Sequence, residues 1–218
     1  MKAKGRRDFV LGIALIAVFA LWTVLIQCVD VRPVGQNGTD VGFAAFNVWF
    51  HKWTGMHMAI YAVTDWLGLV PVLICMIFGI VGFMQLVKRR SLKKVDMDLI
   101  LLGLYYIAVI FAYLIFEMIP INYRPVPIEG IMEASYPSST TLLVLSVMPT
   151  LKFQVDRRES RSGVRKMTNT FVFLFSLFMV VGRLLSGVHW FTDIIGAVFL
   201  SAGLFMIYRG VVILTAQG

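Results

Sequence analysis

The sequence GRLLSGVHWFTD (Gly182–Asp193) stands between two long apolar runs near the C-terminal end of the chain. The run before it covers about Phe171–Leu185, and the run after it covers about Phe191–Leu214. Apolar runs near the ~20 residues that cross a bilayer predict membrane helices, here joined by a short turn. The turn contains ionisable residues at the edge of both spans, where burial is costly, and such residues mark a candidate functional site.

Three of these ionisable residues have a spacing that brings them together. His189 and Asp193 are four residues apart, so they share one face if the segment is helical. Arg183 lies six residues before His189, across a turn that contains Gly187. A histidine oriented by a carboxylate and facing an arginine is suited to nucleophilic attack on an anionic centre such as a phosphate.

The composition of the whole chain is that of an integral membrane protein. Of its 218 residues, 59% are hydrophobic and 15% are charged, and the mean hydropathy is +0.82. A soluble domain of this size could not bury so much apolar surface. No segment has the composition of a linker, so residues 1–218 are expected to form a single membrane domain. Cys28 and Cys75 have no metal-ligand or redox spacing and are expected to be free thiols.

The apolar pattern predicts an all-α, polytopic membrane protein with six transmembrane helices and an interfacial helix after the first span. The interfacial segment is Val41–Thr54, where Trp49 and Trp53 alternate with polar residues. The six spans are expected at about Phe9–Val29, Met58–Val87, Leu99–Ile119, from after Pro137 to Phe153, Phe171–Leu185 and Phe191–Leu214. Asp65, inside the second span, is expected to cap a helix at the outer interface.

Basic residues are concentrated on one side of this predicted bundle. The chain has 20 lysines and arginines, and all of them fall on that side except Arg32, Lys52, Arg124 and Arg183. Basic loops remain in the cytoplasm. We therefore expect a multi-pass protein of the cell membrane with both termini cytoplasmic and with His189 on the extracytoplasmic face. Orientation in the bilayer also explains the net charge of +8 without a nucleic-acid partner.

A second loop on the outer face reads SYPSSTT (Ser135–Thr141). Pro137 followed by hydroxyl residues predicts the start of a helix, where free backbone N–H groups and the helix dipole attract anions. Arg124 and Arg183 lie on the same face, and each guanidinium group could bind two phosphate oxygens. These features predict a site for a phosphate group at the membrane surface.

Together the three outer loops resemble the type-2 phosphatidic acid phosphatase superfamily, membrane lipid phosphatases distantly related to vanadium haloperoxidases. The motifs of that family are a lysine, six residues and Arg-Pro; then Pro-Ser-Gly-His; then Ser-Arg, five residues, a histidine, three residues and an aspartate. The matching residues here are Arg124-Pro125, Pro137-Ser138 and, in the third motif, Gly182-Arg183, His189 and Asp193. The resemblance covers nearly the whole chain in topology.

The resemblance implies a phosphoenzyme mechanism that requires no metal and no cofactor. His189 would attack phosphorus and form a phosphohistidine, and Asp193 would hold the imidazole in the attacking tautomer. The developing charge on the phosphoryl oxygens would be stabilised by donors from Arg124, Arg183, Ser138 and the backbone of Ser139.

Two positions depart from the family pattern. Glu117 stands where the family has its lysine, and Thr140 where it has the second-motif histidine that protonates the leaving group. Thr140 is therefore assigned to phosphate binding with its neighbouring hydroxyl groups, because general acid catalysis needs a group of suitable pKa. Glu117 is a candidate for the missing acid, as the carboxyl closest to the motif in sequence; equally, it could form an ion pair with Arg124.

The sequence thus predicts a hydrolase that acts on a lipid phosphate or diphosphate in the bilayer. Phosphatidic acid, phosphatidylglycerol phosphate and isoprenyl diphosphate are the candidate substrates, and the altered acid favours the diphosphate, whose leaving phosphate is already a weak base. Two alternatives stay open: a lipid phosphotransferase, and a catalytically weakened protein that binds or transports phosphate lipids. A short chain without appended domains is compatible with a bacterial enzyme. The sequence does not predict the oligomeric state.

Overall fold

The computed structural model describes residues 2–216, and their regular structure is helical. Two short 3₁₀ turns, η1 (Gln36–Gly38) and η2 (Leu92–Lys94), lie in loops. The α-helices are α1 (Lys2–Cys28), α2 (Ala44–Thr54), α3 (Met58–Leu67), α4 (Leu69–Arg89), α5 (Met97–Met118), α6 (Ser139–Arg158), α7 (Ser162–Leu185) and α8 (Phe191–Thr215). The predicted all-α class is confirmed.

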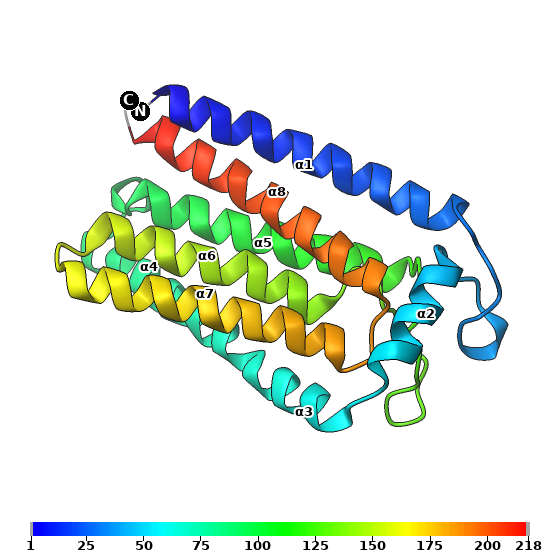
Figure 1. Ribbon diagram of the computed structural model, residues 1–218. Coiled ribbons are helices and arrows are strands. Elements are labelled where there is room, and N and C mark those ends of the chain that lie inside the picture. The colour runs from blue at the N-terminus through cyan, green and yellow to red at the C-terminus, as the bar shows by residue number, and fades with distance from the viewer. Residues whose placement is uncertain (1, 217–218) are drawn as a thin grey trace.

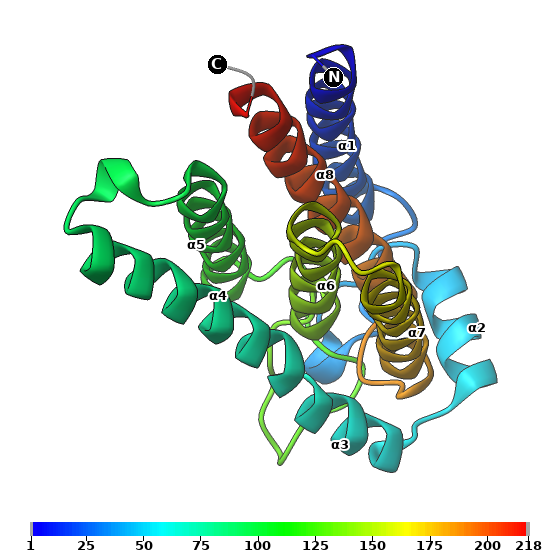
Figure 2. The ribbon, with the colours of Figure 1, turned by 90° about the vertical axis from the view of Figure 1, so that its left-hand side faces the viewer.

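The long helices form a bundle with α6 near its centre. Figure 2 shows α6 surrounded by α4, α5, α7 and α8, each of which packs against it. Helix α1 lies outside this group and runs antiparallel to α8 along almost its whole length (Figure 1). Both termini lie at one end of the bundle, whereas α2 and the turn between α7 and α8 lie at the opposite end (Figure 1).

Five helical segments are long and apolar enough to cross a membrane by length and composition. They correspond to five of the six predicted spans: α1, the pair α3–α4 counted as one segment, α5, α7 and α8. Helix α6, at the fourth predicted span, is not among them. It occupies the middle of the bundle, so its buried side chains pack against protein rather than lipid, and they include hydroxyl groups such as Thr141, Ser146 and Thr150.

The second predicted span is divided into α3 and α4 at Gly68. Pro71 explains the division because proline has no backbone N–H to donate to Leu67 and its ring disfavours a regular turn before it. The break matters for the site, since it lets α3 turn toward the end of the bundle that carries α2 (Figure 1). Helix α2 follows the first span as the sequence predicts, while its position at the membrane interface stays a prediction.

Small residues allow α1 and α8 to approach closely. A Cβ on Gly12 would lie 2.7 Å from the Ile207 backbone nitrogen and 2.9 Å from the Gly203 carbonyl oxygen. Near the cytoplasm-facing end predicted by the charge pattern, the buried Asp8 carboxylate accepts from Arg209, with Nε and Nη2 both at 2.9 Å. Close backbone contact at small residues is a common basis of helix pairing in membranes.

Gly12→Ala should therefore destabilise the bundle through overpacking, by about 1–3 kcal/mol. The measurement is the midpoint of thermal unfolding of the protein in detergent. Gly163→Ala in α7 is the matched control, because a Cβ there meets no heavy atom within 4 Å; it should be neutral or slightly stabilising. Equal melting temperatures for the two variants would contradict the close α1–α8 packing.

Candidate active site

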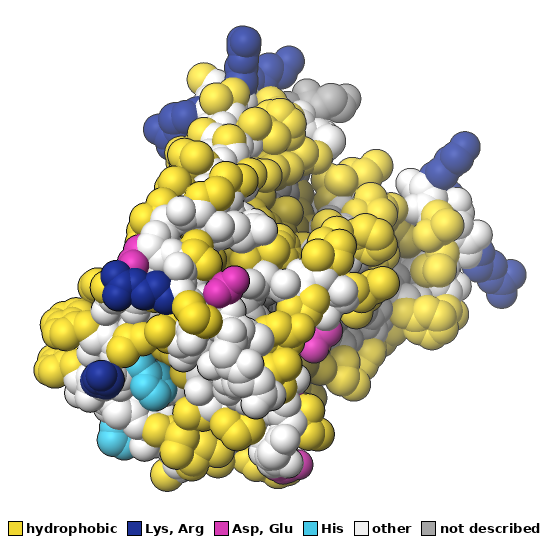
Figure 3. Space-filling model, turned by 90° about the vertical axis from the view of Figure 1, so that its right-hand side faces the viewer, with side chains coloured by type: hydrophobic (Ala, Val, Ile, Leu, Met, Phe, Trp, Pro, Cys, Tyr) yellow, Lys and Arg dark blue, Asp and Glu magenta, His cyan; other side chains and the backbone are white. Residues whose placement is uncertain are grey.

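The site is assembled where three separate segments meet at the end of the bundle opposite the termini. The segments are the loop after α5 with Asn122 and Arg124, the loop and first turn of α6 from Ser135 to Thr140, and the α7–α8 turn with His189. Figure 3 views this end of the molecule, where hydrophobic and uncharged polar groups cover most of the surface and charged groups are sparse. All three motifs singled out in the sequence therefore lie at one end of the bundle.

His189 is linked to Asp193 through a residue that the sequence analysis did not single out. The Nδ1 atom of His189 lies 3.1 Å from the Ser135 hydroxyl oxygen, and that hydroxyl donates to Oδ2 of Asp193. The direct distance from His189 Nδ1 to Asp193 Oδ2 is 4.0 Å, which is too long for a hydrogen bond. The expectation that Asp193 holds the imidazole directly is corrected, because Ser135 lies between them.

The Asp193 carboxylate is fully buried and accepts hydrogen bonds from several segments. Besides Ser135, it accepts from the Asn122 amide at 3.2 Å and from the Trp190 backbone N–H at 2.9 Å. Its own backbone carbonyl accepts from the N–H of Ser138 at 3.2 Å. Asp193 thus joins the first turn of α8 to the loops before α6, and every contact to its carboxylate is a donor, as an ionised group requires.

Arg183 and Arg124 are both buried near one aromatic ring. The guanidinium carbon of Arg183 lies 4.8 Å from the Tyr61 ring centre, and that of Arg124 lies 5.9 Å from it. Arg183 donates to the Thr140 hydroxyl at 2.5 Å and to Asp65 at 3.2 Å. Asp65, which lies in α3, is therefore an ion-pair partner of Arg183 and not the helix cap that the sequence suggested.

Arg124 takes its carboxylate partner from the loop that follows it. Its Nη2 atom lies 2.9 Å from Oε2 of Glu133. Glu117, at the exposed end of α5, lines the same cavity of about 150 Å³ as Arg124, Glu133 and Ser135. The expected alternative of a Glu117–Arg124 ion pair is thus wrong, since Glu133 holds Arg124, and Glu117 lies beside the pair at the cavity rim.

The first turn of α6 presents the predicted hydroxyl groups in different ways. Ser138, directly before the helix, donates to the Thr141 hydroxyl at 3.1 Å. Ser139 is the first helical residue and lines the cavity that also contains Glu117. Thr140 accepts from Arg183, so its first role in this structure is to position that guanidinium group. The free N–H groups of this helix start remain suited to an anion.

Several polar atoms at the centre of this site are buried without a hydrogen-bond partner among residues 2–216. They are Nε2 of His189, Nε and Nη1 of Arg124, and Nε of Arg183. Leaving such groups unpaired costs about 1–3 kcal/mol each, and more for charged groups. An anion bound between the two guanidinium groups, next to Nε2 of His189, would supply the acceptors that Arg124 and Arg183 lack.

His189 is held in its neutral form. It lies in the turn between α7 and α8, is 4% exposed, and has a pKa well below 6.5 because burial disfavours the imidazolium, with the nearby cations Arg124 and Arg183 adding to the effect. A neutral imidazole has a nitrogen lone pair available for attack. The Nδ1 contact to Ser135 makes Nε2 the free nitrogen.

The turn that carries His189 is fixed by α2 and by a glycine. Gly187 has φ +72°, which favours glycine, and a Cβ there would lie 2.3 Å from the Gly55 carbonyl oxygen. The ring Nε2 of His51 lies 3.0 Å from the Gly187 carbonyl oxygen, and Asn47 donates to the Thr192 hydroxyl at 3.0 Å. Contacts with α2, and with the Gly55 backbone directly after it, therefore hold the turn that carries His189.

An apolar groove lies beside these polar groups. It has a volume of about 320 Å³ and is formed between α4, α5 and the first turns of α6, with Leu69, Val109, Ile110 and Leu143 among its lining residues. Asp65 and Thr140 also line it, so it borders the residues that hold Arg183. The site thus combines a polar centre with an adjoining surface suited to hydrocarbon.

Comparisons with known proteins identify the family of this chain and a similar fold. Among curated proteins, no sequence matches the chain. A solved structure that it resembles is described as the crystal structure of the first transmembrane PAP2 type phosphatidylglycerolphosphate phosphatase from Bacillus subtilis, with a TM-score of 0.66 and 17% sequence identity over 92% of this chain and 94% of that one. At this identity the likeness shows the fold alone. The model of the PAP2 superfamily matches residues 39–213, and the chain therefore belongs to the PAP2 superfamily.

Proposed function

We propose that this protein hydrolyses a lipid phosphate or diphosphate through a phosphohistidine formed at Nε2 of His189. The observation that carries the proposal is the group of buried, unpartnered nitrogens on His189, Arg124 and Arg183. Guanidinium groups bind phosphate oxygens well, and they would stabilise the charge that develops on those oxygens in the transition state. Family membership supports phosphatase chemistry of this kind.

The hydrogen-bond chain from His189 to Asp193 determines which nitrogen attacks. The Ser135 hydroxyl has one proton, which it donates to Asp193, so it accepts the Nδ1 proton of His189. Nε2 then forms the bond to phosphorus while the bond from phosphorus to the leaving oxygen breaks. Water subsequently cleaves the phosphohistidine and releases phosphate. Ser135 and Asp193 would stabilise the positive charge on the ring in both steps.

The apolar groove supports a lipid as the substrate. It runs between α4, α5 and α6 directly beside Thr140, where the acyl or isoprenyl part of a lipid could remain in hydrocarbon while its phosphate contacts the arginines. Phosphatidic acid, phosphatidylglycerol phosphate and isoprenyl diphosphate all combine a hydrocarbon part with a phosphate group. The similar fold described as a phosphatidylglycerolphosphate phosphatase makes that lipid a member of the test panel.

The proposed topology has six spans, α6 included, in one membrane domain. Helix α6 runs alongside α5 and α7 (Figure 1), and its buried hydroxyl groups explain why it is less apolar than its neighbours. The loops with most of the basic residues lie at the end that carries the termini. We therefore place that end in the cytoplasm, α2 at the opposite interface and the active site on the extracytoplasmic face.

Removing the nucleophile should abolish turnover. We expect His189→Ala to lower kcat by on the order of 10⁴-fold or more, measured as phosphate release in detergent from phosphatidic acid, phosphatidylglycerol phosphate and undecaprenyl diphosphate. His57→Ala is the matched control, because His57 is exposed and contacts only the nearby Thr54 carbonyl oxygen through its ring. The control should keep wild-type activity.

Three results would contradict this proposal. Full activity of His189→Ala would exclude the phosphohistidine. Product formation that requires an added alcohol would identify a phosphotransferase. Tight lipid binding without release of phosphate from any lipid of the panel would identify a binding protein.

Ser135→Ala should lower kcat on the order of 10- to 100-fold, the usual effect of losing a residue that orients a functional histidine, with KM almost unchanged. On the acidic side of the pH profile, the wild-type rate should fall only well below pH 6.5, because the lowered pKa keeps His189 neutral, and the variant should keep that acidic limb. Ser135→Thr, which retains the hydroxyl, should recover much of the rate. A variant that changes KM and melting temperature but not kcat would show a purely structural role.

The leaving group takes its proton from Glu117 in our proposal, since Thr140 is engaged with Arg183 and Glu117 lines the cavity next to Arg124. Glu117→Gln should then lower the rate with a phosphate monoester by about 10²–10⁴-fold. The rate with a diphosphate should change much less, because its leaving phosphate needs no acid. Glu129→Gln, on an exposed loop, is the control. Unchanged rates with both substrates across pH would show that Glu117 is not the general acid.

A further inference from the structure

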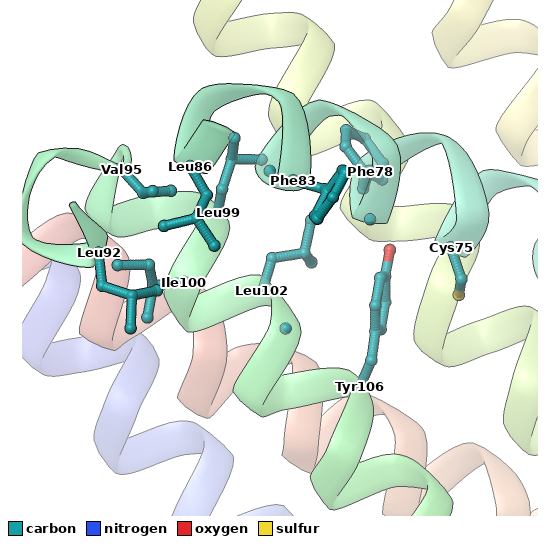
Figure 4. Close-up of a pocket in the computed structure, with 13 residues that line it drawn as sticks. Cys75, Phe78, Phe83, Leu86, Leu92, Val95, Leu99, Ile100, Leu102 and Tyr106 are labelled. Carbon is teal, nitrogen blue, oxygen red and sulfur yellow. The ribbon is translucent and has the colours of Figure 1, made fainter. Parts of the chain in front are cut away.

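A second apolar groove lies at the other end of the bundle, away from the active site. It has a volume of about 310 Å³ and is formed between α4 and α5 and the η2 turn that connects them. Figure 4 shows Phe78, Leu86, Leu99 and Leu102 around the space, with Tyr106 closing its inner end. This groove has no part in the chemistry described above.

Glycine residues make the groove wide. Gly79 and Gly82 on α4 and Gly103 on α5 line it, and a Cβ at any of these positions would meet no heavy atom within 4 Å. Phe83 and Leu92 at its margin are each 65% exposed. The space is therefore unfilled by protein and open on the side where hydrocarbon chains of the bilayer would lie.

Unpaired cations lie in the segment that contributes Leu92 and Val95 to the groove. Lys88 lies in the last turn of α4, Arg90 directly follows that helix, and Lys93 and Lys94 lie in η2; all four are exposed, and none has a carboxylate within ion-pair distance among residues 2–216. The acidic residue nearby, Asp96, is already paired with Arg89 at 2.8 Å and with Arg158 at 3.2 Å. Charge in this segment is thus positive.

Asp96 stays ionised near neutral pH, and its charge does not offset that of the lysines. The hydrogen bond from Arg89 and those from Gln85 and Arg158 lower the pKa of Asp96 to about 2. Asp98, the next carboxylate, contacts Arg158 with both oxygens at 2.8 Å. Both acids therefore neutralise arginines and leave the lysines free.

We propose that this groove binds an anionic phospholipid of the adjacent leaflet, with an acyl chain between α4 and α5 and the headgroup phosphate on Lys93 and Lys94. Apolar lining and a cationic rim match the two parts of such a lipid. A second copy of the chain is a poorer occupant, because a symmetric contact would bring two cationic rims together. The site differs from the catalytic one in position and in its lining, which contains no histidine and no arginine.

The test measures lipid retention by the purified, delipidated protein. It is incubated in detergent with equal amounts of phosphatidylglycerol and phosphatidylcholine, and the bound lipid is identified by native mass spectrometry. We expect phosphatidylglycerol to be retained preferentially. Lys93→Gln with Lys94→Gln should weaken its retention by on the order of tenfold or more, given the usual attraction of an anionic lipid surface for each lysine. Lys2→Gln with Lys4→Gln, at the same end of the bundle, is the matched charge control.

Groove-filling variants test the acyl-chain part independently. Gly82→Leu and Gly103→Leu add side chains where the structure has space, so they should fold, lose the bound phosphatidylglycerol and keep phosphatase activity. Gly163→Leu is the size control. If one groove variant fails to fold, the other and the lysine pair still decide the question.

Several outcomes would overturn the proposal. Equal retention of phosphatidylcholine would show that the groove does not recognise the anionic headgroup. Undiminished retention of phosphatidylglycerol in the groove and lysine variants would place the lipid elsewhere. A dimer that dissociates when the groove is filled would identify a second copy as the occupant.

Discussion

The buried Asp193 carboxylate is the contact on which the rest of the site depends. It sits in the first turn of α8, yet two of its partners come from the connection between α5 and α6: Asn122 soon after α5 and Ser135 just before α6. A buried carboxylate is stable only if donors surround it. Satisfying this one charge therefore brings the three motif segments together, and the same contacts align Ser135 with the ring of His189. Structural stability and the orientation of the His189 ring have a common cause here.

Two further elements support this arrangement from outside the motifs. Helix α1 lies entirely before the part of the chain matched by the family model, but its Trp22 donates to the Thr192 carbonyl oxygen at 3.1 Å and its Thr23 contacts the Tyr136 hydroxyl at 2.7 Å. These contacts reach residues adjacent to Asp193 and Ser135. This peripheral helix therefore helps to hold the turn that carries His189. Helix α2 supports the same turn through Asn47.

The sequence was informative where a pattern repeats or a motif has fixed spacing. Apolar runs predicted the long helices, and the Arg183–His189–Asp193 spacing predicted residues that do lie together. Partners from distant segments were not predictable in this way. Ser135 stands two residues before Pro137, outside the motif, and Asp65 lies in a span that gave no indication of facing Arg183. Tyr61 had the pattern of an ordinary membrane aromatic. The weaker hydropathy of α6 has the same origin, because a central helix packs on protein and its polarity reflects its neighbours rather than the lipid.

The charges around the site explain how a strongly cationic pair can be buried at a membrane edge. Arg183 is paired with Asp65 and Arg124 with Glu133, so each guanidinium group is neutralised on one side. Nε of Arg183 and both Nε and Nη1 of Arg124 stay unpartnered. A phosphate arriving at those nitrogens adds negative charge beside His189. That change opposes the effect of burial and of the two arginines, which disfavour the imidazolium. In the proposed mechanism, the substrate itself would therefore lower the cost of the positive charge that His189 acquires as it attacks phosphorus. The neutral ring would become a stabilised cation only when phosphate is bound.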